Sequence, residues 1–191
     1  MVTVKKLSYY VRLMHEEDIA QATEIDHESF PSEWPPMNYE RELQSWLSHC
    51  IVACKECDKP PPSGKEYIMG FAIFWMIADE AHITNLAVRE IHRHLGIGEL
   101  LLISMIDMAR ELNARNLTLE VRTSNIAAQS LYSKYGFTRV GLRRRYYTDN
   151  KEDAVLMAME STSSTSFQSL LNRLKKAHSK KWGIVLYQVA P

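Results

Sequence analysis

The sequence has no net charge, few cysteines and no long apolar run. Its 23 Lys and Arg residues balance 23 Asp and Glu residues, so no overall field attracts the chain to nucleic acid or to an anionic membrane. No apolar stretch approaches the ~20 residues that cross a bilayer, and the first residues lack the apolar core of a secretory signal. These absences predict a cytoplasmic protein without a membrane partner, whose sites for charged ligands are local.

The cysteines are three in number and lie close together, at Cys50, Cys54 and Cys57. An odd, clustered set is a poor basis for a disulfide framework. His49 beside them suggests zinc, and the spacing of Cys54 and Cys57 suggests a redox pair. However, no second ligand cluster follows, and the strand-to-helix context of a redox motif is missing. We therefore expect reduced thiols on the solvent side of the domain, and no metal.

Composition and length indicate one globular domain followed by a tail. The 191 residues are 46% hydrophobic and 24% charged, which is ordinary for a soluble domain. A serine- and threonine-rich run at 161–166 divides a domain at 1–160 from a basic C-terminal tail at 161–191. Apolar residues at helical spacing predict a helix in the tail, and 182–189 could form a strand. We expect the tail to dock on its own domain or on a partner rather than on nucleic acid.

The apolar pattern of the domain predicts strands that alternate with helices. The order indicates a mixed sheet with helices on both faces, an α/β or α+β fold and not a barrel. Prolines at 30–36 and 59–64 predict irregular segments. The predicted strands are 8–14, 51–54, 67–76, 81–88, 116–121, 137–147 and 154–160, and the predicted helices are 15–29, 38–48, 98–113 and 126–135.

The junction between strand 81–88 and helix 98–113 has the features of an anion site. Arg93-His94-Leu95-Gly96-Ile97-Gly98 connects them, and unpaired N–H groups at a helix start attract phosphate. A dinucleotide-binding fingerprint would need a glycine at Leu101, and the Gly-Lys-Ser/Thr of an ATP-binding loop is absent. NAD and ATP are thereby disfavoured. The alternative is that Gly96 and Gly98 only start and pack the helix.

This Arg-x-x-Gly-x-Gly turn, following Asn85-Leu86-Ala87-Val88, resembles motif A of the GNAT N-acetyltransferases. The resemblance spans roughly residues 8–160 and includes a close likeness to the RimI branch, the bacterial ribosomal-protein alanine N-acetyltransferases. It implies the GNAT fold, with a mostly antiparallel sheet, and acetyl-CoA as cosubstrate. It also extends to Leu119-Glu120-Val121-Arg122, Asn125, Leu131-Tyr132, Tyr135-Gly136-Phe137, Arg144-Arg145-Tyr146-Tyr147 and Glu152-Asp153-Ala154.

The resemblance also assigns residues to the cosubstrate. The strand at Leu86, Ala87 and Val88 would bind pantetheine, and Asn125 would contact CoA besides capping its helix. The pyrophosphate would lie on the turn, where His94, Leu95 and Glu99 depart from residues common in relatives, so that backbone N–H groups carry more of the binding. The turn residues implied are Arg93, His94, Leu95, Gly96, Ile97, Gly98 and Glu99.

Catalytic roles also follow from the resemblance and not from spacing alone. Glu120 corresponds to the general base and Tyr132 to the general acid, while a backbone N–H near Leu86 or Ala87 would meet the oxyanion. On residue pattern alone, Glu120 could instead pair with Arg122 on its strand face. Tyr132 could likewise be an ordinary core aromatic residue.

The acceptor implied by the resemblance is the N-terminal α-amino group of a protein, namely the N-terminal alanine of a ribosomal protein. Tyr146 and Tyr147 are candidates for holding the peptide. Other acceptors, such as lysine or a small amine, stay open. Two rivals are a non-catalytic CoA-binding module and an adaptor that binds nucleic acid or the ribosome through its basic tail.

Overall fold

The structure, a computed structural model, describes residues 9–30, 37–55 and 66–183. Within these residues the strands form one sheet of order β1-β2-β3-β4-β5-β7-β6, in which only β4 and β5 are parallel neighbours. The mixed, mostly antiparallel sheet is thus confirmed. Its strands are β1 (Tyr9–Leu13), β2 (Ser48–Lys55), β3 (Ile68–Ile77), β4 (Glu80–Val88), β5 (Asn116–Arg122), β6 (Thr138–Arg143) and β7 (Ala154–Met159).

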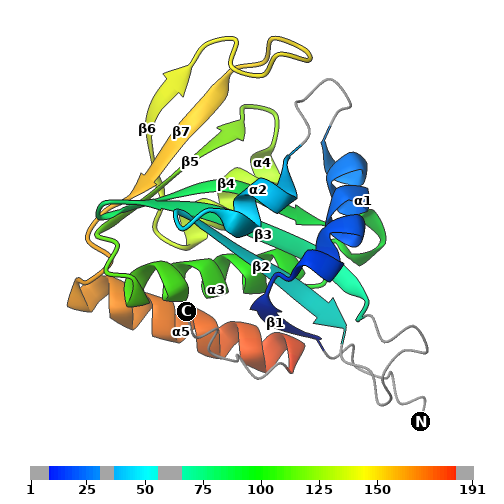
Figure 1. Cartoon of the computed structure of the whole chain (residues 1–191). Helices are drawn as coiled ribbons and strands as arrows, with labels where there is room; N and C mark the ends of the chain where they lie inside the picture. Colours follow the sequence, from blue (N-terminus) through cyan, green and yellow to red (C-terminus); the bar gives the residue numbers. More distant parts are fainter. Residues whose placement is uncertain (1–8, 31–36, 56–65, 184–191) are drawn as a thin grey trace.

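Helices cover both faces of the sheet, as the sequence predicted (Figure 1). One apolar cluster joins α3, α4 and α5 to one face, and a second joins α1 and α2 to the other. Apolar residues at helical spacing explain these elements, because each helix buries one stripe against the sheet. The helices are α1 (Ile19–Ser29), α2 (Tyr39–Gln44), α3 (Ile97–Glu111), α4 (Ile126–Lys134) and α5 (Thr165–Trp182), with short 3₁₀ turns at Glu16–Asp18 and Glu90–His92.

The two parallel strands separate halfway along their length. β4 and β5 pair only over Glu80–Ile83 and Asn116–Leu119, although both strands continue beyond. At the point of separation Thr84 is an extra residue in the pairing of β4 with β3, and its hydroxyl donates to Ile73 O at 3.2 Å. Such a bulge bends the strand and increases its twist. The backbone edge of β4 beyond the bulge therefore borders an opening in the sheet.

Two predicted elements extend too far. The helix expected at 38–48 ends at Gln44, because Ser45 is extended and the chain from Ser48 pairs with β3. The strand expected at 137–147 ends at Arg143 and is followed by a turn in which Arg145 has a φ of 52°. The irregular segments predicted at 31–36 and 59–64 lie outside the described residues.

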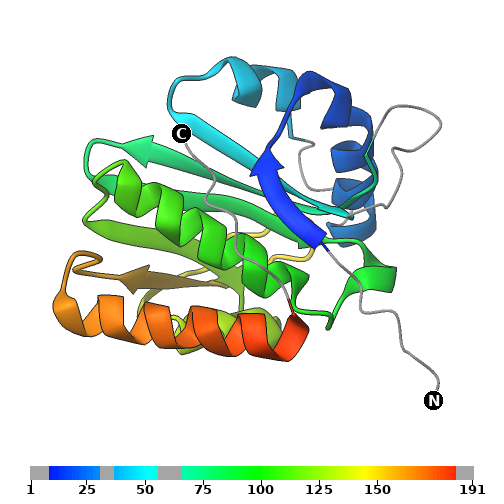
Figure 2. The same cartoon turned by 90° about the horizontal axis from the view of Figure 1, so that it is seen from below.

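The tail contributes a long helix that packs on the domain. α5 lies alongside α3 (Figure 2), with Phe167 and Leu171 buried in the same apolar cluster as α3 and Lys175 paired with Asp107 of α3. The strand expected at 182–189 is wrong at its first residue, since Trp182 ends α5 and Gly183 caps it with a φ of 69°. Residues 184–189 lie outside the described part.

The structure also bears on the cysteines, on metal binding and on membrane-spanning helices. The expectation of solvent-side thiols is wrong for Cys50 and Cys54, which are free and buried because β2 is an inner strand of the sheet. Burial raises the pKa of each thiol to about 11. Cys57 lies outside the described residues. In the described ranges, no group of three or more His, Cys, Asp or Glu side chains is arranged to hold a metal. No helix there is long and apolar enough to span a bilayer.

Candidate active site

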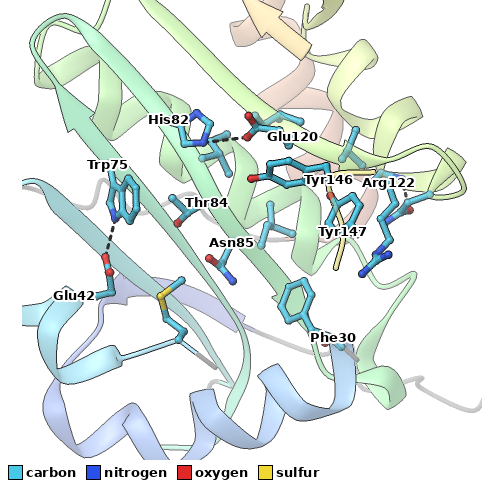
Figure 3. A pocket seen from close by; sticks show the side chains of 18 of the residues that line it. Phe30, Glu42, Trp75, His82, Thr84, Asn85, Glu120, Arg122, Tyr146 and Tyr147 are labelled. Atoms are coloured by element: carbon cyan, nitrogen blue, oxygen red, sulfur yellow. Dashed lines mark hydrogen bonds and ion pairs between the residues drawn. The ribbon is translucent and has the colours of Figure 1, made fainter. Parts of the chain in front are cut away.

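A cavity of about 760 Å³ lies at the opening between β4 and β5 (Figure 3). Its size falls within the range of small-molecule sites. Strand ends, α2, α4 and the segment after β6 all contribute to its wall. The lining includes Phe30, Met37, Arg41, Glu42, Trp75, His82, Thr84, Asn85, Leu86, Leu119, Glu120, Val121, Arg122, Asn125, Ala128, Leu131, Tyr132, Tyr146 and Tyr147.

Glu120 places a largely buried carboxylate in the wall of this cavity. Its side chain is only 7% exposed, and its two oxygens lie 3.1 Å from His82 Nε2 and 3.0 Å from Arg143. Burial alone would raise the pKa of Glu120, but the hydrogen bond from His82 and the charges of His82 and Arg143 hold it below its ordinary value. Glu120 is therefore a carboxylate at neutral pH.

Glu120 does not pair with Arg122, so the alternative ion pair is wrong. Arg122 instead pairs with Asp149 at 2.9 Å and Glu152 at 3.2 Å, in the segment between β6 and β7. Its guanidinium also lies 3.8 Å from the ring centre of Tyr147, which is within range of a cation–π interaction. Arg122 thus fixes Tyr147 in the cavity wall.

His82 links Glu120 to the protein surface. Its Nδ1 lies 2.9 Å from Thr118 Oγ1, and that hydroxyl donates to the exposed Glu80 at 2.9 Å. Since Thr118 gives its proton to Glu80, Nδ1 of His82 must be the donor, while Nε2 faces a carboxylate that only accepts. Sequence analysis missed His82; alternation along β4, which puts it on the face of Glu80 and Thr84, was the only available signal.

α4 carries the second predicted catalytic residue. Tyr132 is 8% exposed, lines the cavity and has its ring 5.8 Å from that of Phe137, so it is both a core aromatic residue and a cavity residue. Burial raises the pKa of Tyr132 to about 12. Asn125 begins the helix, and its side chain accepts from Ala128 N at 3.0 Å, as predicted for an N-cap.

The predicted phosphate turn starts α3 with two residues of positive φ, His94 at 62° and Gly96 at 81°. The first hydrogen bond of the helix runs from Leu100 N to Gly96 O at 2.9 Å. The preceding amides of the helix thus point out of its end, where the helix dipole favours an anion. In the described part of the chain, no group accepts from the N–H groups of Ile97, Gly98 and Glu99.

Side chains of the turn add little charge toward such an anion. Arg93 is exposed and donates to Val88 O at 3.2 Å, while Glu99 pairs with Lys134 and accepts from Tyr135 Oη at 2.7 Å. These contacts agree with a turn that uses backbone more than side chains. The turn residues 93–98 do not line the cavity around Glu120, so this site has two separate parts.

α5 supports the turn from behind. His178, 2% exposed, has its Nε2 2.9 Å from Gly96 O, so Nε2 carries the proton because a carbonyl only accepts. Trp182 packs so closely that a Cβ added to Gly96 would lie 2.4 Å from its Nε1. Gly96 is therefore required both by its positive φ and by this contact. A Cβ on Gly98 would meet Leu86 and Val88 at an ordinary 3.6 Å.

The class of protein follows from this arrangement together with a match to a known family. The sheet splits at a bulge, a helix N-terminus lies beyond the split, and a buried carboxylate faces the gap. A family model described as the Acetyltransferase (GNAT) family matches residues 19–137. The chain belongs to this family and is an N-acetyltransferase; enzymes of this class take the acetyl group from acetyl-CoA.

Individual relatives show which acetyltransferases the chain is similar to. The chain is 38% identical over 148 residues to the putative ribosomal protein bS18-alanine N-acetyltransferase of Bacillus subtilis, covering 77% of this chain and 92% of that protein. It is 32% identical over 158 residues to an N-alpha-acetyltransferase of Sulfolobus acidocaldarius, covering 81% and 94%. The Escherichia coli ribosomal-protein-S18-alanine N-acetyltransferase structure superimposes with a TM-score of 0.68 at 29% identity, covering 82% and 96%.

The fold and family expected from the resemblance are thus confirmed, while the roles of individual residues stay predictions. The structure brings Glu120, Tyr132, Asn125, Tyr146 and Tyr147 to one cavity. It also adds residues that sequence analysis did not single out. These are His82 and Arg143 beside Glu120, and Glu42 with Trp75 on the opposite side (Figure 3).

Proposed function

We propose that this enzyme acetylates the N-terminal α-amino group of a protein, with the N-terminal alanine of a ribosomal protein as its acceptor. The names of the relatives from Bacillus subtilis and Escherichia coli support this acceptor. The observation that carries the proposal is the buried Glu120 carboxylate, which faces a cavity open enough to admit a chain terminus.

Acetyl-CoA would bind along the opening of the sheet. It supplies an acetyl thioester, which is activated toward attack by an amine. Among the described residues, the backbone edge of β4 at Leu86–Val88 has no strand partner on the β5 side and can hydrogen-bond pantetheine. The amides at the start of α3 can hold the pyrophosphate, and Asn125 is placed to contact CoA at the start of α4. A backbone N–H at Leu86 or Ala87 is the candidate for the oxyanion.

Glu120 acts as the general base. A free α-amino group has a pKa of about 7.7–8.0, so a fraction is already neutral at physiological pH. The remaining proton becomes acidic as the nitrogen bonds to carbon, and even a carboxylate of lowered pKa can then accept it, directly or through water. His82 and Arg143 keep Glu120 charged and oriented.

Tyr132 acts as the general acid toward the departing thiolate. Its pKa of about 12 keeps the phenol protonated throughout the working pH range. The proton is therefore always available, and its transfer to a thiolate depends on where the hydroxyl is held. Tyr146 and Tyr147 form the wall against which the acceptor peptide lies.

Acetyl transfer to peptides that differ only in their first residue tests this function. Glu120→Gln and Tyr132→Phe should each lower turnover by about 100-fold or more, the usual contribution of general acid–base catalysis, while calorimetry still detects CoA binding. Glu160→Gln, at an exposed carboxylate just after β7, is the matched control. Full turnover in both site variants would remove the assigned pair, and equal rates on free lysine or polyamine would refute the N-terminal acceptor.

A further inference from the structure

A second carboxylate faces the cavity from the side opposite Glu120. Glu42 on α2 is 9% exposed and lines the cavity. One of its oxygens, Oε2, accepts hydrogen bonds from Ser48 Oγ at 2.6 Å and from Trp75 Nε1 at 2.7 Å. Figure 3 shows Glu42 and Trp75 together on one side of the cavity and Glu120 on the other, with His82 on β4, the strand between them. Two donors on neighbouring strands thus fix the position of this side chain.

The other oxygen of Glu42 is available for a ligand. Both fixing hydrogen bonds go to Oε2, and no donor from the described residues reaches Oε1. Arg41 also lines the cavity, but it is exposed, and no ion pair joins it to Glu42 because adjacent helix residues do not face one another. Glu120, in contrast, has the guanidinium of Arg143 at one oxygen and the ring of His82 at the other. A largely buried carboxylate without a cation is costly unless a partner arrives.

The spacing of the two carboxylates can be worked out from the sheet. Ser48, Trp75, His82 and Thr118 form one row across β2, β3, β4 and β5, and Glu120 lies on the same face two residues after Thr118. Strands are about 4.8 Å apart, so Trp75 on β3 and the β5 strand are separated by about 10 Å. An extended peptide that starts at Glu120 advances about 3.4 Å per residue. A long basic side chain on its second or third residue spans the remaining distance to Glu42.

We propose that Glu42 forms a subsite for a lysine or arginine side chain at the second or third residue of the acceptor. The amine would lie at Glu120, while the basic side chain would donate to Oε1 of Glu42 with its stem beside the indole of Trp75. The indole, 37% exposed, offers an apolar face for such a stem and a π face for its charge. This inference rests on the proposed function, because it assumes a peptide acceptor.

Paired peptides that differ only in charge test the subsite. Arginine at the second or third residue is compared with citrulline, which has nearly the same shape but no charge. In the wild-type enzyme the arginine peptide should have a kcat/KM about tenfold or more above the citrulline peptide, the effect of one charge-assisted hydrogen bond. Glu42→Gln, which still accepts from Trp75 and Ser48, should bring this ratio close to one. Glu40→Gln, at an exposed position of the same helix, should keep it.

The outcomes separate the subsite from the proposed function. No preference in the wild-type enzyme, or a preference that survives Glu42→Gln, overturns the subsite. Binding of the same peptides is also measured by calorimetry with CoA present. If no peptide is acetylated, the proposed function fails, and the binding ratio then decides the subsite alone. Tighter binding of the arginine peptide that Glu42→Gln abolishes supports the subsite. Equal binding of the arginine and citrulline peptides to the wild-type enzyme overturns it.

Discussion

Gly96→Ala is the substitution whose cost follows most directly from the structure. Gly96 has a φ of 81°, and an alanine forced into the left-handed region costs about 1–2 kcal/mol. The new Cβ would also lie 2.4–2.7 Å from three indole atoms of Trp182, and overpacking of this kind costs about 1–3 kcal/mol more. We therefore expect Gly96→Ala to lower the free energy of unfolding by about 2–5 kcal/mol.

A double-mutant cycle separates the two contributions. In a Trp182→Ala background the indole is absent, so Gly96→Ala should cost only the backbone term of about 1–2 kcal/mol. Urea unfolding of the four proteins measures this coupling. Gly98→Ala is the control, because its Cβ meets only ordinary contacts and helical alanine is favoured over glycine by up to about 1 kcal/mol. An equal cost of Gly96→Ala in both backgrounds would refute the packing of α5 on the turn.

Three further predictions concern other parts of the site. Asn125→Ala should lower the free energy of unfolding by about 1 kcal/mol through loss of the N-cap, and an unchanged urea midpoint would contradict this. Burial would raise the pKa of Glu152, but hydrogen bonds from Ser124 and its neighbours lower it to about 2. The ionised Glu152 side chain therefore stabilises the fold above its ordinary pKa of about 4.3, and this stabilisation is lost as the pH falls toward 2. Glu152→Gln should be less stable than wild type at pH 6, and the difference in the free energy of unfolding should shrink toward pH 2. A difference that stays constant with pH would contradict this. At pH 8 the native thiols of Cys50 and Cys54 should alkylate about 100-fold more slowly than in urea, because few are ionised at a pKa of about 11; equally fast labelling would rule this out.

Sequence alone predicted the elements whose signals are local. The apolar stripe of α3, the N-cap at Asn125 and the glycine after α4 each act within a few residues. The error at α2 arose because Leu43, Trp46 and Leu47 fit a helical period, although the chain turns at Ser45 to pair β2 with β3. Trp46, 86% exposed, is not part of any helical stripe. Tertiary strand pairing here overrode the local pattern.

The contacts that shape the site join residues far apart in the chain. His82 reaches Glu120 across a parallel pair of strands, and His178 reaches Gly96 across 82 positions. Neither pairing has a local signature, because each depends on how the sheet and α5 pack. Glu42 is a similar case: its helix is short and polar, and only the placement of Ser48 and Trp75 shows that it faces the cavity.

The most direct test of N-terminal acetylation uses purified enzyme, acetyl-CoA and an alanine-initiated peptide that also contains an internal lysine. Tandem mass spectrometry then locates the transferred acetyl group. The proposed function predicts acetyl on the α-amino nitrogen, at a rate that falls by about 100-fold or more in Glu120→Gln. Acetyl found on the lysine ε-amine, or on no amine of the peptide, would contradict it.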